Sequence, residues 1–356
     1  MRITAIHSRV EHIPLLRPYT IAFRSIAAIT TVIVEVHTDR GLVGLGAASP
    51  EPYVTGESNE ACQAALRQDS LEWLIGRDVR TLPALCRELG RRLAETPAAR
   101  AAIDIALHDL LAQYLNLPLV EILGRVHTSL PTSITIGIKP LAETLAEAEE
   151  YIGRGFRVLK VKLGHSLEEN LERLHRLREE IGPAIAIRVD PNQGYDPGQV
   201  MTFLVHTAKL AIEFLEQPVP VAQTEALRIL PDSVRRRLVA DEALLNETDA
   251  LRLIVSPRPY GIFNIKLMKC GGIQPALTIA AIAETAGIDL MWGCMDESRI
   301  GISAALHAAL ASPATHYLDL DGSFDLARDV VTGGFVLAEG CLRTTETPGL
   351  GVNRLG

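Results

Sequence analysis

Five charged residues recur along this chain at nearly constant spacing. The intervals between them are 28, 26, 25 and 25 residues, which is about the length of one strand-helix unit in a (β/α)8 barrel. If each residue ends a strand, all five face the same mouth of the barrel. The spacing therefore predicts three carboxylates flanked by amines at one site. The five residues are Lys162, Asp190, Glu216, Asp241 and Lys266.

Length, charge and cysteine content limit the class of protein. A chain of 356 residues is expected to form one large domain and a smaller one. A net charge of −8 argues against nucleic acid as a partner, and the N-terminal residues resemble neither a signal peptide nor a membrane span. Five cysteines without a CxxC pair are typical of reduced thiols, so a cytoplasmic protein without a membrane partner is predicted. Whether it is a homo-oligomer is left open. Of Cys270 and Cys294, one could line a pocket, although a buried structural role is favoured for both.

The first third of the chain shows strand patterns followed by helix patterns. Alternating or β-branched residues predict antiparallel strands at 3–10, 29–38 and 42–47. Helical periodicity follows at 60–74, 85–93 and 98–114. We therefore predict an α+β domain over residues 1–125.

From residue 126 onward, predicted strands and helices alternate, as in a parallel α/β barrel. The alternation gives eight strands and seven intervening helices over residues 126–325. Residues 326–356 show no eighth helix; a strand is expected at 333–339 and irregular chain after it, returning to the first domain. The predicted barrel strands are 132–136, 158–162, 186–190, 212–216, 239–241, 262–266, 289–292 and 315–319.

The three carboxylates predict a metal site. A carboxylate at the end of a buried strand is costly unless it is paired or bound to a cation, and three that face one point require one. Only oxygen ligands are offered, so Mg²⁺ fits better than Zn²⁺. The alternative is that the three side chains cap the following helices independently. The predicted ligands are Asp190, Glu216 and Asp241.

The lysines predict proton transfer. Lys160 and Lys162 point the same way from one strand, because side chains alternate with a period of two. Beside another ammonium and a divalent cation, Lys162 would lose its proton more easily, as a general base requires. Lys266 lies four strands further on, across the barrel mouth. Two amines on opposite faces of a metal-held carboxylate predict epimerisation, whereas Lys269 is expected to be a surface residue at a helix N-terminus.

Longer motifs resemble the muconate-lactonising subgroup of the enolase superfamily. They are the KxK of Lys160 and Lys162, DPNQG from Asp190, EQP from Glu216, Asp241-Glu242, NIK ending at Lys266 and KCGG from Lys269, with ALHDLLAQYLNLPLVEILG and PGLGV elsewhere. The resemblance covers nearly the whole chain. It implies a modified TIM barrel, (β/α)7β, with an α+β capping domain built from the N-terminus and the C-terminal tail. It also implies one essential Mg²⁺ and a metal-stabilised enolate.

The resemblance also suggests roles for single residues. Lys162 and Lys266 match the acid/base pair, and Lys160 matches the lysine that tunes Lys162. Neighbouring groups expected to support the ligands are Asn192, Glu242 and Lys269.

Residues at the end of the eighth predicted strand distinguish between the reactions of this subgroup. Asp319 and Asp321 form a DxD pair that resembles the one with which dipeptide epimerases hold the substrate α-ammonium. Cycloisomerases and o-succinylbenzoate synthases have no ammonium to bind, and they remain the alternatives within the subgroup. Turn-forming aspartates before Gly322 are the structural alternative. The non-enzymatic alternative is a barrel that binds a small acid without catalysis.

The specificity of a dipeptide epimerase would depend on the loop at 293–298, with Met295 and Asp296, and on two loops of the capping domain at 20–25 and 49–58. Arg24, in the first of these, matches a basic residue of Ala-Glu epimerases. Glu51 and Asp296 are acids that such enzymes do not share. Because these loops carry two acidic residues and one basic residue, the predicted pocket favours dipeptides with Lys or Arg side chains. L-Ala-D/L-Glu epimerisation is the runner-up.

Overall fold

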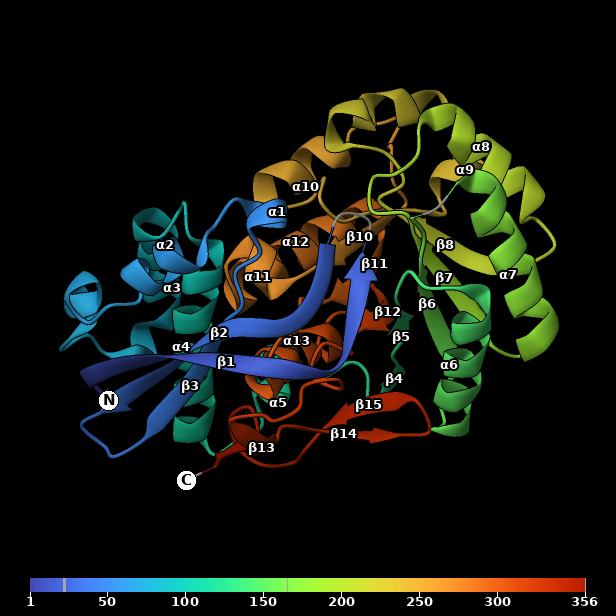
Figure 1. Ribbon diagram of the computed structural model, residues 1–356. Coiled ribbons are helices and arrows are strands. Elements are labelled where there is room, and N and C mark those ends of the chain that lie inside the picture. Colours follow the sequence, from blue (N-terminus) through green and yellow to red (C-terminus); the bar gives the residue numbers. More distant parts are fainter. Residues whose placement is uncertain (22–23, 165, 356) are drawn as a thin grey trace.

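The computed structural model describes residues 1–21, 24–164 and 166–355. A parallel barrel lies beside a capping domain that contains the N-terminus (Figure 1). The eight barrel strands are hydrogen-bonded in sequence order, and an isolated parallel bridge from Thr132 to Leu318 joins the first to the last. The (β/α)7β prediction is therefore confirmed. The strands are β5 (Ile134–Ile136), β6 (Val158–Lys162), β7 (Ala186–Asp190), β8 (Ile212–Glu216), β9 (Leu238–Ala240), β10 (Ile262–Ile265), β11 (Asp289–Gly293) and β12 (Thr315–Asp319).

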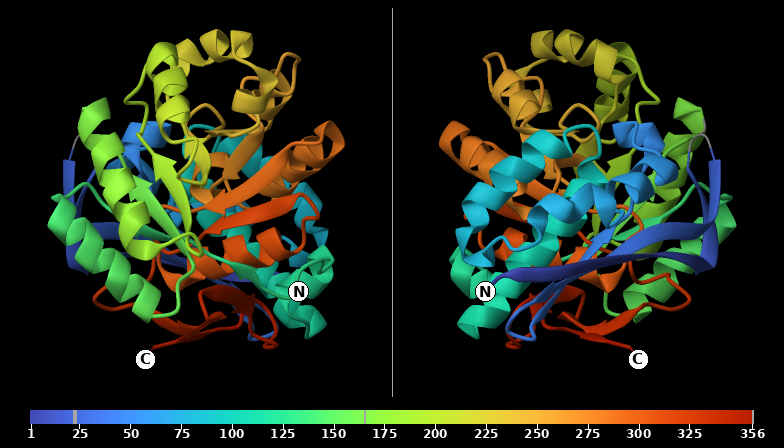
Figure 2. Two further views of the ribbon diagram at one scale, coloured as in Figure 1. Left: turned by 90° about the vertical axis from the view of Figure 1, so that its right-hand side faces the viewer. Right: turned by 90° about the vertical axis from the view of Figure 1, so that its left-hand side faces the viewer.

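Helices surround the barrel on its outer side (Figure 2). Several begin with a strong cap: the Ser166 side chain and Glu169 form a capping box at α7, and Asp196 with Gln199 does the same at α8. In the fourth crossover, where one helix is predicted, Pro231 separates a 3-10 helix from a single α-turn. The crossover helices are α6 (Leu141–Gly153), α7 (Leu167–Ile181), α8 (Pro197–His206), η3 (Val221–Ile229) with α9 (Asp232–Arg235), α10 (Glu247–Leu253), α11 (Leu267–Cys270) with α12 (Ile273–Ala286), and α13 (Arg299–Leu310).

The capping domain packs a three-stranded antiparallel sheet against helix α4 (Pro97–Leu115). Gly46 makes this approach possible, because a Cβ there would lie 1.8 Å from the carbonyl oxygen of Ala102. The predicted helix at 60–74 is in fact two pieces, since Ser70 Oγ donates to the Ala64 carbonyl at 2.9 Å and the chain turns. The other elements are β1 (Ile3–Ile21), β2 (Arg24–Thr38), β3 (Val43–Ala48), α1 (Pro52–Thr55), α2 (Asn59–Ala65), η1 (Asp69–Leu74), η2 (Val79–Thr81), α3 (Leu82–Arg92) and α5 (Leu119–Leu123).

The β1–β2 hairpin reaches from the capping domain along the barrel to helix α6 (Figures 1 and 2). Its register continues past an irregularity between Pro14 and Tyr19, so the segment at 20–25 that was expected to be a loop belongs largely to the hairpin strands. Leu16 N donates to the Asp325 carbonyl at 2.7 Å, and Arg17 forms an ion pair with Glu150 of α6. The hairpin thereby forms part of one wall of the barrel mouth.

The C-terminal segment returns to the capping domain through ordered contacts. Leu350 N donates to Asp109 Oδ1 of α4 at 2.9 Å, and Arg354 pairs with Glu35 of β2. The expectation of irregular chain at the end is wrong, because residues 352–354 form a strand that pairs with residues 331–333. The domain boundaries at 125 and 325 stay a prediction. The tail strands are β13 (Val331–Gly333), β14 (Phe335–Ala338), β15 (Cys341–Thr344) and β16 (Val352–Arg354), and β15 pairs with β4 (Leu130–Pro131).

Within the described residues, no helix combines the length and the apolar character needed to cross a bilayer.

Candidate active site

The carboxyl ends of the barrel strands bring the predicted charged residues together. Lys160 Nζ, on β6, lies 2.7 Å from Glu216 Oε2 and 3.6 Å from Asp190 Oδ2. Lys162, two residues further along β6, donates to Asp190 Oδ2 at 2.6 Å. Lys266 follows β10 and donates to Asp241 Oδ2 at 2.8 Å. All five regularly spaced residues thus meet at one mouth, as their spacing predicts.

Lys269 does not lie on the surface, and that part of the prediction is wrong. Only 3% of the residue is exposed, and its ammonium donates to the Asp241 side chain and to the Asn264 carbonyl. The short helix α11 folds back directly after β10 and directs Lys269 beneath Asp241. Lys269 therefore supports a carboxylate of the cluster.

Amide groups hold the other carboxylates in place. Asn192 donates from its backbone to Asp190 Oδ1 at 2.8 Å, and Asn264 Nδ2 donates to Glu216 Oε1 at 2.9 Å. The Asn192 backbone has φ 45°, a left-handed conformation that asparagine tolerates better than most residues. Sequence reasoning identified Asn192 but missed Asn264, which lies inside a buried strand and could have been found from its place in the NIK motif.

The residues of this cluster fit a divalent cation. Lys160, Lys162, Lys266 and Lys269 face six carboxylates, so two negative charges remain if all are ionised. Within the described part of the chain, Glu216 Oε2, Glu242 Oε2 and Asn192 Oδ1 are buried without a hydrogen bond, although Glu216 Oε2 lies close to Lys160. Buried oxygens of this kind, two of which (Glu242 Oε2 and Asn192 Oδ1) have no hydrogen-bond partner, suit a hard cation such as Mg²⁺. The six carboxylates are those of Asp190, Glu216, Asp241, Glu242, Asp319 and Asp321.

The pKa shifts agree with an excess of negative charge. Burial, together with the neighbouring Asp190 and Asp241, raises the pKa of Glu216 to about 7 against the opposing effect of Lys160. Burial and Asp241 raise the pKa of Glu242 to about 8. Burial would also raise the pKa of Asp241, but Lys266 and Lys269 outweigh it and hold that pKa well below its usual range. Burial and the repulsion between neighbouring carboxylates thus oppose full ionisation of Glu216 and Glu242.

Two lysines of the cluster, Lys160 and Lys266, hold their protons tightly. Burial lowers the pKa of Lys160 and Lys266, but the surrounding carboxylates outweigh it and raise both pKa values above the ordinary range. For Lys160 and Lys266, the protein side chains alone therefore do not loosen the proton. A divalent cation among the same carboxylates would remove the charge that retains these protons.

The two aspartates at the end of β12 have different surroundings. Asp319 accepts hydrogen bonds from Ser133 Oγ and Lys160 Nζ, and these contacts outweigh burial and lower its pKa to about 2. Asp321 accepts from the Thr135 backbone at 2.7 Å, yet burial and the neighbouring Asp319 raise its pKa to about 7. Both line the pocket at the barrel mouth. Asp321 is the one of the two that lacks a lysine partner among the described residues.

The rim of this pocket comes from the loops that the sequence indicated. Glu51 caps helix α1, and it lines the pocket together with Met295 and Asp296. Arg24 begins β2, but its side chain lies outside the described part of the structure. Cys294 also lines the pocket, whereas Cys270, the last residue of α11, is buried.

A further wall of the pocket was missed by sequence reasoning. It is formed by Lys139, Glu147 and Tyr151 on and before α6, by Arg17 of the hairpin and by Asp325 after β12. The spacing of Glu147 and Tyr151 on one face of a helix was a possible signal. The direction of that face depends on how α6 packs, which the sequence does not reveal.

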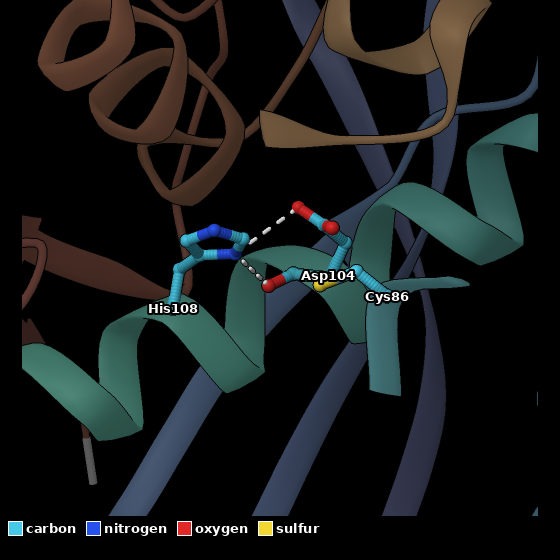
Figure 3. Close-up of side chains that lie close together, drawn as sticks. All are labelled: Cys86, Asp104 and His108. Atoms are coloured by element: carbon cyan, nitrogen blue, oxygen red, sulfur yellow. Dashed lines mark hydrogen bonds and ion pairs between the residues drawn. The ribbon is translucent and has the colours of Figure 1, made fainter. Parts of the chain in front are cut away.

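A second group of potential metal ligands lies in the core, between α3 and α4 (Figure 3). Cys86, Asp104 and His108 are close together, but His108 Nδ1 lies 2.8 Å from the Asp104 carbonyl, which can only accept a hydrogen bond. This nitrogen therefore carries a proton and offers no lone pair to a metal. Asp104 Oδ1 accepts from Ile273 N at 2.6 Å and so caps helix α12 of the barrel. The group joins the capping domain to the barrel.

Fold and site together define a capped barrel with a carboxylate and lysine cluster at its mouth. Residues 4–124 match the mandelate racemase / muconate lactonizing enzyme N-terminal domain, and residues 143–354 match the family described as enolase C-terminal domain-like. The chain belongs to the mandelate racemase and muconate lactonizing enzyme group of the enolase superfamily.

Within this group, the chain is similar to proteins that act on cationic dipeptides. It is 64% identical over 99% of both chains to the L-Lys-D/L-Arg epimerase of Methylococcus capsulatus. It is 54% identical, over the full length of both, to an L-Lys-D/L-Arg epimerase of Desulforapulum autotrophicum. The crystal structure of the dipeptide epimerase from M. capsulatus with Mg and L-Arg-D-Lys superimposes with a TM-score of 0.98, at 64% identity and 99% coverage of both chains.

Proposed function

We propose that this protein is a Mg²⁺-dependent dipeptide epimerase that inverts the α-carbon of the C-terminal residue and favours dipeptides with Lys or Arg side chains. The observation that carries the proposal is the placement of two lysine amines. Lys162 ends β6 and Lys266 follows β10, and these strands are four apart in a barrel of eight, so the amines face each other across the mouth. The similarity to L-Lys-D/L-Arg epimerases supports the substrate class.

The two lysines would transfer different protons on opposite faces of the substrate. One amine removes the α-proton from one face of the C-terminal residue, and the ammonium on the opposite side returns a proton to the other face. Asp190, Glu216 and Asp241 would hold the Mg²⁺, which when bound would neutralise charge on the substrate carboxylate and acidify the neighbouring α-carbon. Lys160, buried between Glu216 and Asp319, would tune the charge around Lys162.

The aspartates after β12 support a substrate that carries an ammonium group. Asp321 offers a pocket-lining carboxylate with no lysine partner among the described side chains, and an α-ammonium would supply the missing positive charge. A cycloisomerase or o-succinylbenzoate synthase substrate has no such group. Asp319 is already engaged by Lys160, so we assign the larger share of ammonium recognition to Asp321.

Incubation with Mg²⁺ and a dipeptide library in D₂O tests the proposal. We expect deuterium at the α-carbon of the C-terminal residue, read as a mass gain of one unit by mass spectrometry, with the fastest exchange in dipeptides that contain Lys or Arg. N-acetylated dipeptides should exchange more slowly, because they lack the ammonium. If no dipeptide exchanges while a muconate or cyclohexadiene carboxylate is turned over, the proposal is wrong. A preference for L-Ala-L-Glu would instead select the runner-up.

A further inference from the structure

The outer wall of the pocket is formed by α6, the β1–β2 hairpin and the segment after β12, and two of its carboxylates, those of Glu147 and Asp325, line the pocket. Glu147 pairs with Lys139 at 2.6 Å and accepts a hydrogen bond from the Tyr151 hydroxyl at 3.0 Å. Glu150 pairs with Arg17 at 2.6 Å and also lies 3.7 Å from Arg154. The other pocket-lining carboxylate of this wall is that of Asp325.

Asp325 lines the pocket but has no ionic partner there. Among the side chains that the structure describes, which leave out residues 19–25, 165 and 356, none forms an ion pair or hydrogen bond with its carboxylate, whereas its backbone carbonyl accepts from Leu16 N. Burial raises its pKa, and the opposing fields of Arg17 and Arg154 do not cancel that effect. A cation on a bound substrate would add to the fields of Arg17 and Arg154 and stabilise this half-buried carboxylate further.

The position of Asp325 indicates which part of a dipeptide it meets. A turn closed by a hydrogen bond from Phe324 N to the Asp321 carbonyl, at 2.8 Å, connects Asp321 to Asp325. If Asp321 binds the α-ammonium, the residue that carries this ammonium is the N-terminal one, and its side chain leaves from the same point. A lysine or arginine side chain can extend along the turn to Asp325. Glu51 and Asp296 lie on the capping-domain and β11 sides of the pocket instead.

We propose that Asp325 is a specificity residue that binds the cationic side chain of the N-terminal residue of the dipeptide. This inference rests on the proposed function and deepens it. It assigns the two side chains of a doubly cationic dipeptide to separate acids, with Asp325 for the N-terminal residue and the rim acids for the C-terminal one.

The test compares Asp325→Asn with the parent protein on L-Lys-L-Ala, L-Ala-L-Lys and L-Ala-L-Ala, with kcat/KM measured by deuterium exchange. We expect the preference for L-Lys-L-Ala over L-Ala-L-Ala to fall about tenfold, and the preference for L-Ala-L-Lys over L-Ala-L-Ala to change much less. Asp325→Lys should shift selectivity toward L-Glu-L-Ala. Glu149→Gln is the matched control, because it removes one negative charge from the exposed side of α6.

Each outcome decides the inference. Equal preference ratios in the parent and in Asp325→Asn would overturn it while the epimerase proposal stands. A loss confined to L-Ala-L-Lys would also overturn it, because Asp325 would then serve the C-terminal residue. The same loss in Glu149→Gln would show a long-range field effect in place of a contact. Failure of the parent protein to exchange any dipeptide would remove the proposed function as well.

Discussion

The inner ring and the outer rim of the barrel mouth differ in how they are built. In the inner ring, Asp190, Glu216 and Asp241 are at most 2% exposed, and each is held by a lysine or amide on a strand or in the turn that follows one. In the outer rim, Glu51, Asp296 and Asp325 come from connecting segments and are partly exposed. The residues that would perform the chemistry are thus held by buried contacts. Those that would determine substrate specificity lie in connecting segments, where substitutions disturb the fold least. The predictions below test this division.

The largest effects are expected from the inner lysines. Lys162→Ala or Lys266→Ala should lower epimerisation by about 10³-fold, because each removes one of the two proton carriers. Each variant should retain deuterium exchange with one configuration of the C-terminal residue, which NMR in D₂O can detect for the separate L,L and L,D dipeptides. Thermal melting close to that of the parent would show an intact fold. Full epimerisation in either variant would contradict the two-lysine mechanism.

Removal of the metal should have an effect of similar size. Chelation is expected to abolish exchange, and added Mg²⁺ should restore it. Because a ligand that binds only the folded state stabilises it, saturating Mg²⁺ should also raise the Tm of the parent by a few degrees. Glu216→Gln should lose most of this increase in Tm, a readout that does not depend on activity. An equal Mg²⁺ response in both proteins would place the ion elsewhere.

The inner ring could be predicted from the sequence, because a repeat of about 25 residues and the alternation of side chains along strands determine where strand ends meet. Lys269 was misplaced, since the pattern did not reveal that α11 turns back beneath Asp241. For a similar reason, the sequence did not predict most of the pocket wall that contains Asp325, Tyr151 and Arg17. It requires the β1–β2 hairpin to extend to α6, and that depends on packing between segments more than a hundred residues apart.

The division between inner ring and outer rim also requires the capping domain to stay docked on the barrel. We expect this docking to weaken at acidic pH. His307 of α13 is fully buried; its Nδ1 accepts from Val120 N, and Nε2 lies 3.4 Å from the Leu350 carbonyl, to which it donates in the neutral form. Burial, with a smaller contribution from Arg125, lowers its pKa to about 4 from the ordinary 6.5 against the opposing hydrogen bond to Leu350.

The sign of the pH effect follows from this lowered pKa. The neutral imidazole contributes its full stability above pH 6.5, and the contribution falls as the pH drops toward 4. About 2 kcal/mol should be lost at pH 5 from this group. Urea unfolding at pH 7 and pH 5 measures the loss, and His307→Gln should show a weaker dependence on pH. An unchanged pH dependence in that variant would assign the loss to other groups.

The smallest effect is expected at the rim, where the charge of the pocket should select the side chain of the C-terminal residue. Asp296→Asn should lower the preference for L-Ala-L-Lys over L-Ala-L-Glu by about tenfold, since a rim carboxylate attracts a cation and repels an anion. Glu51→Gln should act in the same direction. Met295→Leu is the control, because it alters the same pocket without changing its charge. The comparison requires kcat/KM for both dipeptides in each variant. If the Asp296→Asn ratio equals that of the parent, this carboxylate does not read the side chain, and the rim would recognise its substrate by shape instead of charge.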